Sequence, residues 1–285
     1  MKTLAAGQSI AEIHTPPVEK MPGHWLLAKM GKRVLRPGGL ELTHKLLGEF
    51  AIGPQDDVVE FAPGLGATAR ITLARHPHSY TAVERDREAA ATVGRYLTES
   101  SQRCIVGTAE DTSLPASSAS IVYGEAMLSM QPGTTKARII AEAARLLKPG
   151  GKYGIHELCL IPDGVSEATR NAIQQGLSDE IHVGVRPLTV SEWKELLESA
   201  GLKVIAEHRA PMHLLEPVRL VKDEGLLRAI RFVWNVIRTP AARQRVRAMR
   251  KVFRTYRDHL AAIALVAQKP AAQKPFAQKP ETIEL

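Results

Sequence analysis

Cysteine, aromatic residues and long apolar runs are all scarce in this chain of 285 residues. The two cysteines, Cys104 and Cys159, are too few for a disulfide scaffold or for a zinc site made of four thiolates. No apolar run approaches the roughly 18–20 residues that a membrane-spanning helix needs. The N-terminal segment contains Glu12 and no continuous apolar stretch, so it does not resemble a signal peptide. We therefore expect a soluble, cytoplasmic protein with reduced cysteines.

Positive charge is plentiful but unevenly distributed. The formal net charge of +8 by itself favours a nucleic-acid partner. Between Lys222 and Arg257, however, eleven Lys and Arg residues stand against only Asp223 and Glu224, so this segment carries the whole excess. With 44% apolar and 24% charged residues, the chain as a whole has the composition of a globular protein.

Both ends of the chain differ from its middle. Residues 1–20 show no sustained periodicity and contain Pro16-Pro17. Residues 269–285 belong to a stretch that repeats Gln-Lys-Pro, and each proline removes a backbone donor. We expect a flexible lead over 1–20, a single folded domain over 21–268, and a disordered tail over 269–285.

Short apolar runs alternate with helical patterns in the folded part. Strands are expected at residues 57–62, 80–84, 103–107, 120–124, 152–158, 202–208 and 260–267, and helices at 67–74, 87–97, 135–147 and 190–199. A tight turn is expected at residues 148–151, and Ser191 is the expected N-cap of the last helix. This alternation predicts an α/β, Rossmann-like fold with a doubly wound, seven-stranded, mostly parallel sheet. Such sheets bind ligands beyond the carboxyl ends of their strands.

A glycine-containing loop follows the first expected strand. Gly64 and Gly66 allow a sharp turn and a close approach of ligand to the main chain. Glu84 ends the next strand, about 20 residues later, where a carboxylate can accept both hydroxyls of a ribose. The arrangement predicts an adenosine-containing ligand. Residues 64–69 satisfy the dinucleotide pattern G-x-G-x-x-A, so NAD(P) is one alternative.

Four motifs in order favour a different ligand. They are Glu60-x-Ala62-x-Gly64-x-Gly66, Gly107-Thr108-Ala109-Glu110…Leu114-Pro115, Met127-Leu128…Gln131-Pro132 with Leu146-Leu147-Lys148-Pro149-Gly150-Gly151, and Arg186-Pro187-Leu188-Thr189…Trp193…Leu202. Together they resemble the class I S-adenosylmethionine-dependent methyltransferases, in particular the group that includes the methyltransferases of ubiquinone and menaquinone biosynthesis. The resemblance runs from about residue 57 to residue 204.

The resemblance implies which residues contact the cofactor S-adenosylmethionine and its product S-adenosylhomocysteine. It assigns this contact to Glu60, Ala62, Pro63, Gly64, Gly66, Glu84, Arg85, Thr108, Ala109, Glu110 and Glu125. Two positions depart from the family pattern, since Ala62 replaces its first glycine and Thr108 stands where an aspartate usually contacts adenine. Arg36, in a segment that often caps the cofactor in this family, is expected to pair with the methionine carboxylate or to pack on the sheet edge.

Three side chains are candidates for catalysis. Glu125 follows the fourth strand, and His156 and Glu157 lie near the end of the fifth, so all three are expected to face the cleft. His156 could act as a base because imidazole titrates near neutral pH, or it could be a hydrogen-bonded strand residue. Methyl transfer from a sulfonium needs a base only when the nucleophile must lose a proton. No metal site is expected.

Helical segments flank the expected sheet fold. Residues 21–52 predict a helical cap with an apolar cluster, and residues 215–258 predict a basic helical insert before the last strand. In the insert, one apolar face comprises Leu226, Ile230, Val233 and Ile237, and a second comprises Val246, Met249, Phe253 and Tyr256. Three interpretations remain open for the insert. It is a packed helical pair with a solvated basic face, a peripheral membrane surface, or, least favoured, a nucleic-acid contact.

These observations predict a methyltransferase that acts by in-line transfer on a small-molecule, lipophilic acceptor. An NAD(P)-dependent oxidoreductase is the first alternative. A methyltransferase-like protein that binds the cofactor without turnover is the second. The sequence does not identify the acceptor, the methylated atom or the oligomeric state.

Overall fold

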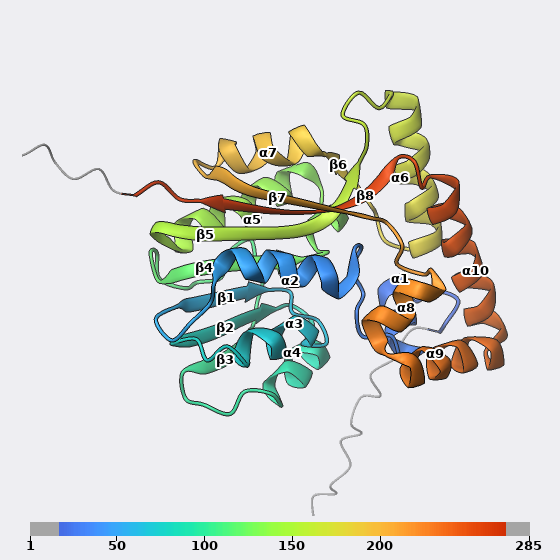
Figure 1. The fold of residues 1–285 in the computed structure, drawn as a ribbon, viewed down its shortest axis with the longest axis horizontal. Coiled ribbons are helices and arrows are strands. Elements are labelled where there is room, and N and C mark those ends of the chain that lie inside the picture. Colours follow the sequence, from blue (N-terminus) through green and yellow to red (C-terminus); the bar gives the residue numbers. More distant parts are fainter. Residues whose placement is uncertain (1–16, 272–285) are drawn as a thin grey trace, which may run out of the picture.

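The computed structural model describes residues 17–271, so most of the expected lead and tail lies outside the described residues. One mixed sheet runs through the centre of the molecule (Figure 1). Its strand order is β3-β2-β1-β4-β5-β8-β7, and the two-residue β6 pairs with β5. The strands are β1 (Asp57–Phe61), β2 (Ser79–Glu84), β3 (Gln102–Val106), β4 (Ala119–Glu125), β5 (Leu147–Leu160), β6 (Leu188–Thr189), β7 (Lys203–Pro211) and β8 (Leu260–Gln268).

The expected fold class is confirmed. All pairings are parallel except those of β8, which runs antiparallel to both β5 and β7. The seven expected strands are all present, and β6 is an additional short one. Every residue of β8 up to Ala267 is buried, as expected of a strand covered on both faces.

Helices cover both faces of the sheet. On one face, α2 (Gly39–Phe50), α3 (Ala67–Leu73) and α4 (Arg87–Gly94) contribute Leu42, Ala69 and Val93 to a shared core. On the other face, α5 (Gly133–Leu146) and α7 (Val190–Ser199) contribute Ile140 and Trp193. This is the doubly wound arrangement that strand–helix alternation predicts.

Two local expectations were wrong. Thr189, and not Ser191, is the N-cap of α7, because its hydroxyl accepts a hydrogen bond from the amide of Glu192, whose side chain in turn accepts one from the amide of Thr189. Residues 148–151 do not form a tight turn before the strand. Leu147 already pairs with Ala119, and these residues bulge within β5 before pairing resumes at Lys152.

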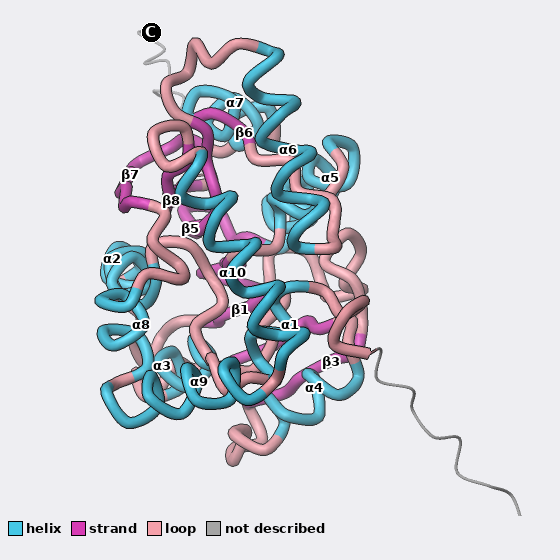
Figure 2. Tube along the Cα trace, turned by 90° about the vertical axis from the view of Figure 1, so that its right-hand side faces the viewer, coloured by secondary structure: helices cyan, strands magenta, loops and turns pink. Residues whose placement is uncertain are grey.

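A third group of helices gathers beyond the carboxyl ends of the parallel strands, on the right in Figure 1 and in front of the strands in Figure 2. It contains α1 (Gly23–Lys29), α6 (Glu167–Ile181), and the three helices between β7 and β8, which are α8 (Pro217–Glu224), α9 (Leu226–Arg238) and α10 (Pro240–Thr255). Their apolar side chains, among them Leu26, Ile173 and Phe253, form a separate core. The sheet and this helical end therefore enclose the region where a doubly wound fold binds its ligand.

A buried ion cluster ties the N-terminal segment to the insert. The ammonium group of Lys32 lies 3.8 Å from a carboxylate oxygen of Asp223 and 3.7 Å from one of Glu224. The carboxylate of Glu224 also accepts the amide hydrogen of Val34 at 2.9 Å, and that of Asp223 accepts the amide hydrogen of Leu40 at 3.0 Å.

In the described chain, no helix combines the length and the apolar character needed to cross a bilayer.

Candidate functional site

A cavity of about 600 Å³ lies between the carboxyl ends of the strands and the helical end. Its volume is in the range of small-molecule sites, roughly 300–1,000 Å³. The cavity brings together most of the residues that the sequence singles out, namely Arg36, Glu60, Ala62, Pro63, Gly64, Glu84, Arg85, Thr108, Ala109, Glu110, Glu125 and Glu157. Gly66 and His156 lie outside its lining.

The two loop glycines serve different purposes. Both have positive φ, 55° at Gly64 and 72° at Gly66. A side chain at Gly64 would meet no described residue within 4 Å, so its backbone is open to a ligand in the cavity. A Cβ at Gly66 would lie 2.8 Å from the ring of Tyr96, so this glycine is required by packing. Ala62 also has a positive φ of 51°, a conformation that costs an alanine roughly 1–2 kcal/mol.

Glu84 connects the glycine loop to the end of β2. Its two carboxylate oxygens accept the amide hydrogens of Gly64 and Asp86, each at 3.0 Å. An ionised carboxylate offers about four acceptor positions, so Glu84 can still accept hydroxyl groups from a ligand. Arg85 and Thr108 line the neighbouring wall, while Glu110 is paired with Arg138.

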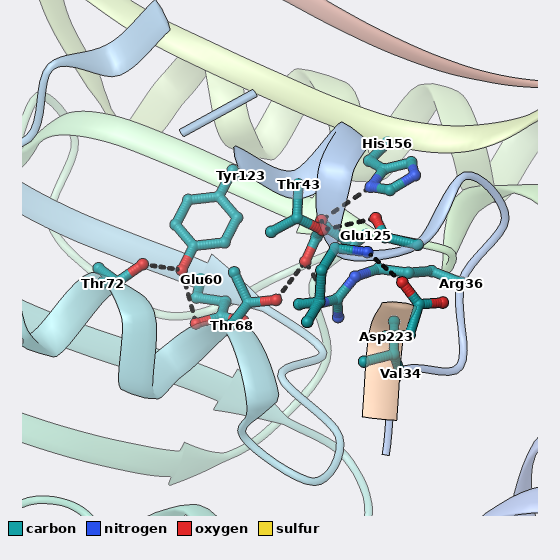
Figure 3. Close-up of polar contacts among 12 residues, drawn as sticks. Val34, Arg36, Thr43, Glu60, Thr68, Thr72, Tyr123, Glu125, His156 and Asp223 are labelled. Carbon is teal, nitrogen blue, oxygen red and sulfur yellow. Dashed lines mark hydrogen bonds and ion pairs between the residues drawn. The ribbon is translucent and has the colours of Figure 1, made fainter. Parts of the chain in front are cut away.

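A polar network surrounds Glu125 at the end of β4 (Figure 3). One carboxylate oxygen accepts the hydroxyl hydrogen of Thr43 at 2.6 Å and lies 2.8 Å from Nδ1 of His156. The other accepts the hydroxyl hydrogen of Thr68 and lies 3.3 Å from Nη1 of Arg36. Burial opposes ionisation, but the charge of Arg36 and the contact with His156 outweigh it and lower the pKa of Glu125 to about 2. Glu125 is therefore a fixed negative charge beside the cavity.

His156 is enclosed by this network and has no exposed surface. Its Nε2 lies 2.5 Å from the carbonyl oxygen of Pro37, which can only accept, so this nitrogen donates. Its Nδ1 faces the ionised carboxylate of Glu125 and donates as well. With both nitrogens donating, the ring offers no lone pair to a substrate. The geometry therefore argues against the base role considered for His156 and favours the interpretation as a hydrogen-bonded strand residue.

Glu157 organises the segment that follows β4. Its carboxylate accepts the amide hydrogens of Met127, Leu128 and Ser129 at 2.9, 2.7 and 3.0 Å, and the hydroxyl hydrogen of Ser129 at 2.7 Å. Burial raises the pKa of Glu157 despite these four contacts. The side chain is committed to holding the loop that lines the cavity, so we assign it a positioning role and not direct contact with reacting atoms.

Glu60 lies under the glycine loop. One of its oxygens accepts the phenolic hydrogens of Tyr80 and Tyr123 at 2.5 and 2.7 Å, and the hydroxyl of Thr72 is 2.7 Å from that of Tyr123. Burial, only partly offset by these hydrogen bonds, raises the pKa of Glu60 to about 7. The network joins β1, β2 and β4 immediately below the cavity floor.

Arg36 reaches the cavity from the segment before α2. Although its Nη1 faces Glu125, its Nε and Nη2 are buried and have no hydrogen-bond partner among the described residues. Orphaned donors are rare in folded proteins because an unpaired buried polar group costs about 1–3 kcal/mol. Arg36 also lines the cavity, and two donors of one guanidinium match the two oxygens of a carboxylate.

Sequence reasoning missed several residues of the site. Thr43, Thr68, Tyr80 and Tyr123 carry no motif and become relevant only through their contacts with Glu125 and Glu60. His24 on α1 lines the cavity, and its buried Nδ1 has no partner in the described chain. Burial and the charge of Arg85 lower the pKa of His24 to about 4, so its ring is neutral. Among the described residues, no group of three His, Cys, Asp or Glu could hold a metal.

Comparison with known sequences agrees with this geometry. The family model described as a methyltransferase domain matches residues 59–155, which include the glycine loop, the ends of β2 and β4, and the first part of β5. An uncharacterized protein of Haemophilus influenzae is 31% identical over 255 residues, which cover 87% of this chain and 98% of the relative. The likeness therefore extends over the helical end as well as the sheet.

Solved structures with low sequence identity share the fold. Phosphoethanolamine N-methyltransferase 2 of Haemonchus contortus, crystallised with S-adenosyl-L-methionine, superimposes with a TM-score of 0.66 at 16% identity, over 87% of this chain and 57% of that one. The [4+2]-cyclase SpnF superimposes with a TM-score of 0.65 at 16% identity, over 86% of this chain and 90% of that one.

Proposed function

Because this chain belongs to the class I S-adenosylmethionine-dependent methyltransferases, we propose that it methylates a small, lipophilic acceptor held in the apolar part of its cavity. The observation that carries the proposal is the division of one cavity into two chemically different parts. Residues at the strand ends make a polar part, and residues of the helical end make an apolar part.

The polar part fits the cofactor. The open backbone at Gly64 admits a ligand, and the carboxylate of Glu84 is placed to accept ribose hydroxyls. The two donors of Arg36 that have no partner in the described part of the chain suit the carboxylate of the methionine portion. When bound, S-adenosylmethionine supplies a methyl group that the sulfonium charge already activates. The protein then has to align the acceptor and keep water out.

The apolar part fits a lipophilic acceptor. Its walls come from α1 and the following segment, from α6 and the residues after it, from the residues after β7, and from the insert. They comprise Trp25, Leu27, Leu35, Ile181, Val185, Met212, Leu214, Met249 and Phe253. Methionine side chains adapt to ligands of irregular shape. Burial of apolar ligand surface against these walls contributes roughly 25 cal/mol per Å² to binding. A charged amine would lose its hydration there without gaining a compensating partner.

We assign to His24, which lines the cavity, the role of orienting the acceptor. Its Nδ1 has no partner among residues 17–271, and the ring is neutral because its pKa is lowered to about 4. A neutral imidazole can hydrogen-bond an acceptor hydroxyl or thiol and so orient it. We infer that phenols, quinols or thiols with apolar substituents are the acceptors. The oxidoreductase alternative is not favoured, because the family match covers the same glycine loop.

The test is a methyl-transfer assay with isotopically labelled S-adenosylmethionine and a series of phenols, quinols and thiols of increasing alkyl length. We expect kcat/KM to rise with chain length, and His24→Ala to lower kcat for the best acceptor at least tenfold without changing the affinity for S-adenosylhomocysteine. Lys29→Ala, at the exposed end of the same helix, is the matched control. Methylation restricted to small hydrophilic amines would overturn the proposal.

A further inference from the structure

The insert exposes apolar side chains that a packed helical pair would bury. On α9, Ala229, Phe232 and Val236 are the buried residues. The face expected from the sequence periodicity instead points outward, with Leu226, Ile230, Val233 and Ile237 all exposed. Trp234 is 57% exposed and Leu227 is 83% exposed. Val218 and Val221 on α8 extend the same surface. We call this set of eight exposed side chains the α8–α9 apolar surface.

The exposed apolar and basic side chains of α9 lie in different sectors around the helix axis. With about 100° between successive residues, the six exposed apolar side chains fall within one sector of roughly 120°. The buried residues occupy a second sector. Arg228, Arg231 and Arg238 lie between the two on one side of the helix, with Arg231 and Arg238 next to the apolar sector. The guanidinium of Arg238 lies 5.4 Å from the ring centroid of Trp234. A helix with an apolar sector, a tryptophan and flanking arginines has the composition of one that lies in a membrane interface.

The charge around this surface is positive and uncompensated. In the described part of the chain, Arg228, Arg231 and Arg238 have no carboxylate partner, whereas the nearby acidic residues are already engaged. Asp223 and Glu224 are buried with Lys32, and Glu216 pairs with Arg250 at 2.9 Å and Arg254 at 2.8 Å. The surface therefore suits a negatively charged partner, and two copies of it would repel each other.

The surface and the acceptor part of the cavity belong to the same helical unit. Phe232 and Val236 on the inner side of α9 pack in the core that also contains Met249 and Phe253, which line the cavity. A groove between α8 and α9, lined by Leu220, Ile230, Val233 and Trp234 among others, opens on the outer side. Docking through the outer side would thus bring the acceptor cavity close to whatever the helix rests on.

We propose that the α8–α9 apolar surface docks on a bilayer that contains anionic lipids, with the apolar sector in the headgroup region and the three arginines against lipid phosphates. The docking rests on the surface alone. Its purpose, access to an acceptor dissolved in the membrane, rests on the proposed function. A basic side chain near an anionic surface strengthens binding about fivefold, so the three arginines together contribute about a hundredfold.

The experiment is vesicle co-sedimentation of the full chain with phosphatidylcholine alone and with phosphatidylcholine containing phosphatidylglycerol, at low and high salt. We expect binding to the anionic vesicles that weakens with salt, and a blue shift of tryptophan emission that Trp234→Phe removes. Ile230→Asp should reduce binding at least tenfold. The triple change Arg228→Gln, Arg231→Gln, Arg238→Gln should reduce it about a hundredfold and abolish the salt dependence.

Controls separate this proposal from its rivals. Ile205→Asp on β7 introduces the same charge at another exposed isoleucine and should leave vesicle binding unchanged. Loss of binding in Ile205→Asp, or no binding by the wild type, would overturn the proposal. The proposal would also be overturned by a dimer in sedimentation velocity that Ile230→Asp dissociates. Nucleic-acid binding that is equal in wild type and Ile230→Asp would overturn it as well. Methylation of a short-chain, water-soluble acceptor should be the same in Ile230→Asp and wild type, so a failure of docking is distinguishable from a failure of the proposed function.

Discussion

Replacement of Arg36 by methionine tests the assignment of the polar part of the cavity. Arg36 is buried and contacts Glu125 through Nη1 at 3.3 Å, while its Nε and Nη2 have no partners within the described residues. If those two donors bind the methionine carboxylate of the cofactor, Arg36→Met removes two charge-assisted hydrogen bonds. Each contributes about 1.5–3 kcal/mol, and about 1.4 kcal/mol corresponds to a tenfold change in affinity. At the lower end of that range the affinity falls about a hundredfold.

The assay is calorimetric titration with two ligands that differ in one portion. S-adenosylhomocysteine carries the carboxylate, whereas 5′-methylthioadenosine keeps the nucleoside and lacks the amino acid. We expect Arg36→Met to lose about a hundredfold affinity for the first and to bind the second as the wild type does. Arg36→Lys, which keeps the charge but not the planar fork, should fall between them.

A control variant and a folding measurement complete this test. Lys29→Met removes one positive charge from an exposed position on α1 and should leave both affinities unchanged. Thermal unfolding of each variant establishes that it is folded at the titration temperature. An equal loss for both ligands, or no loss for either, would refute the assignment of Arg36 to the carboxylate.

Three further predictions concern stability and pH. Ala62→Gly relieves the positive φ of 51° and should stabilise the protein by about 1 kcal/mol in urea unfolding, and a decrease would contradict the strain argument. Because the folded-state pKa of Glu60 is raised from 4.5 to about 7, its contribution to stability is full below pH 4.5 and is lost as the pH rises through 7. Wild type should therefore lose about 3 kcal/mol relative to Glu60→Gln across that window, and parallel pH profiles of the two proteins would exclude this. Lys32→Met leaves two buried carboxylates without their cation and should lower the free energy of unfolding by about 3–5 kcal/mol. The matched change Lys45→Met, at an exposed ion pair on α2, should be nearly neutral. Equal effects of the two changes would show that the buried cluster is not stabilising.

The sheet and the glycine loop could be predicted because their signals are local. The uninterrupted apolar run of β8 marks a strand that is buried on both faces. Gly64 follows β1 and Glu84 ends β2, so the β1–α3–β2 unit brings both residues to the same edge of the sheet. There the amide of Gly64 donates to the carboxylate of Glu84 at 3.0 Å. The N-cap at Thr189 could also have been predicted from the sequence, since Thr189 and Glu192 have the spacing of a capping box.

What the sequence did not predict depends on long-range contacts. The state of His156 is set by the carbonyl of Pro37, 119 residues away, and no periodicity reports such a contact. The orphaned donors of Arg36 and Nδ1 of His24 are likewise visible only once the cavity has formed. On α9, periodicity identified an apolar face correctly but did not show that this face is exposed to solvent. The helix also has a second, smaller apolar sector around Phe232, and it is that sector which packs against the helical end.

The most direct test of the central claim is calorimetric titration of the wild-type chain with S-adenosylhomocysteine, with NADH in a parallel experiment. The two ligands share an adenosine portion and differ in what the rest of the cavity must accept. We predict micromolar binding of S-adenosylhomocysteine and no detectable binding of NADH. Binding of NADH without S-adenosylhomocysteine would contradict the assignment of Arg36 to the methionine carboxylate and with it the methyltransferase site described above.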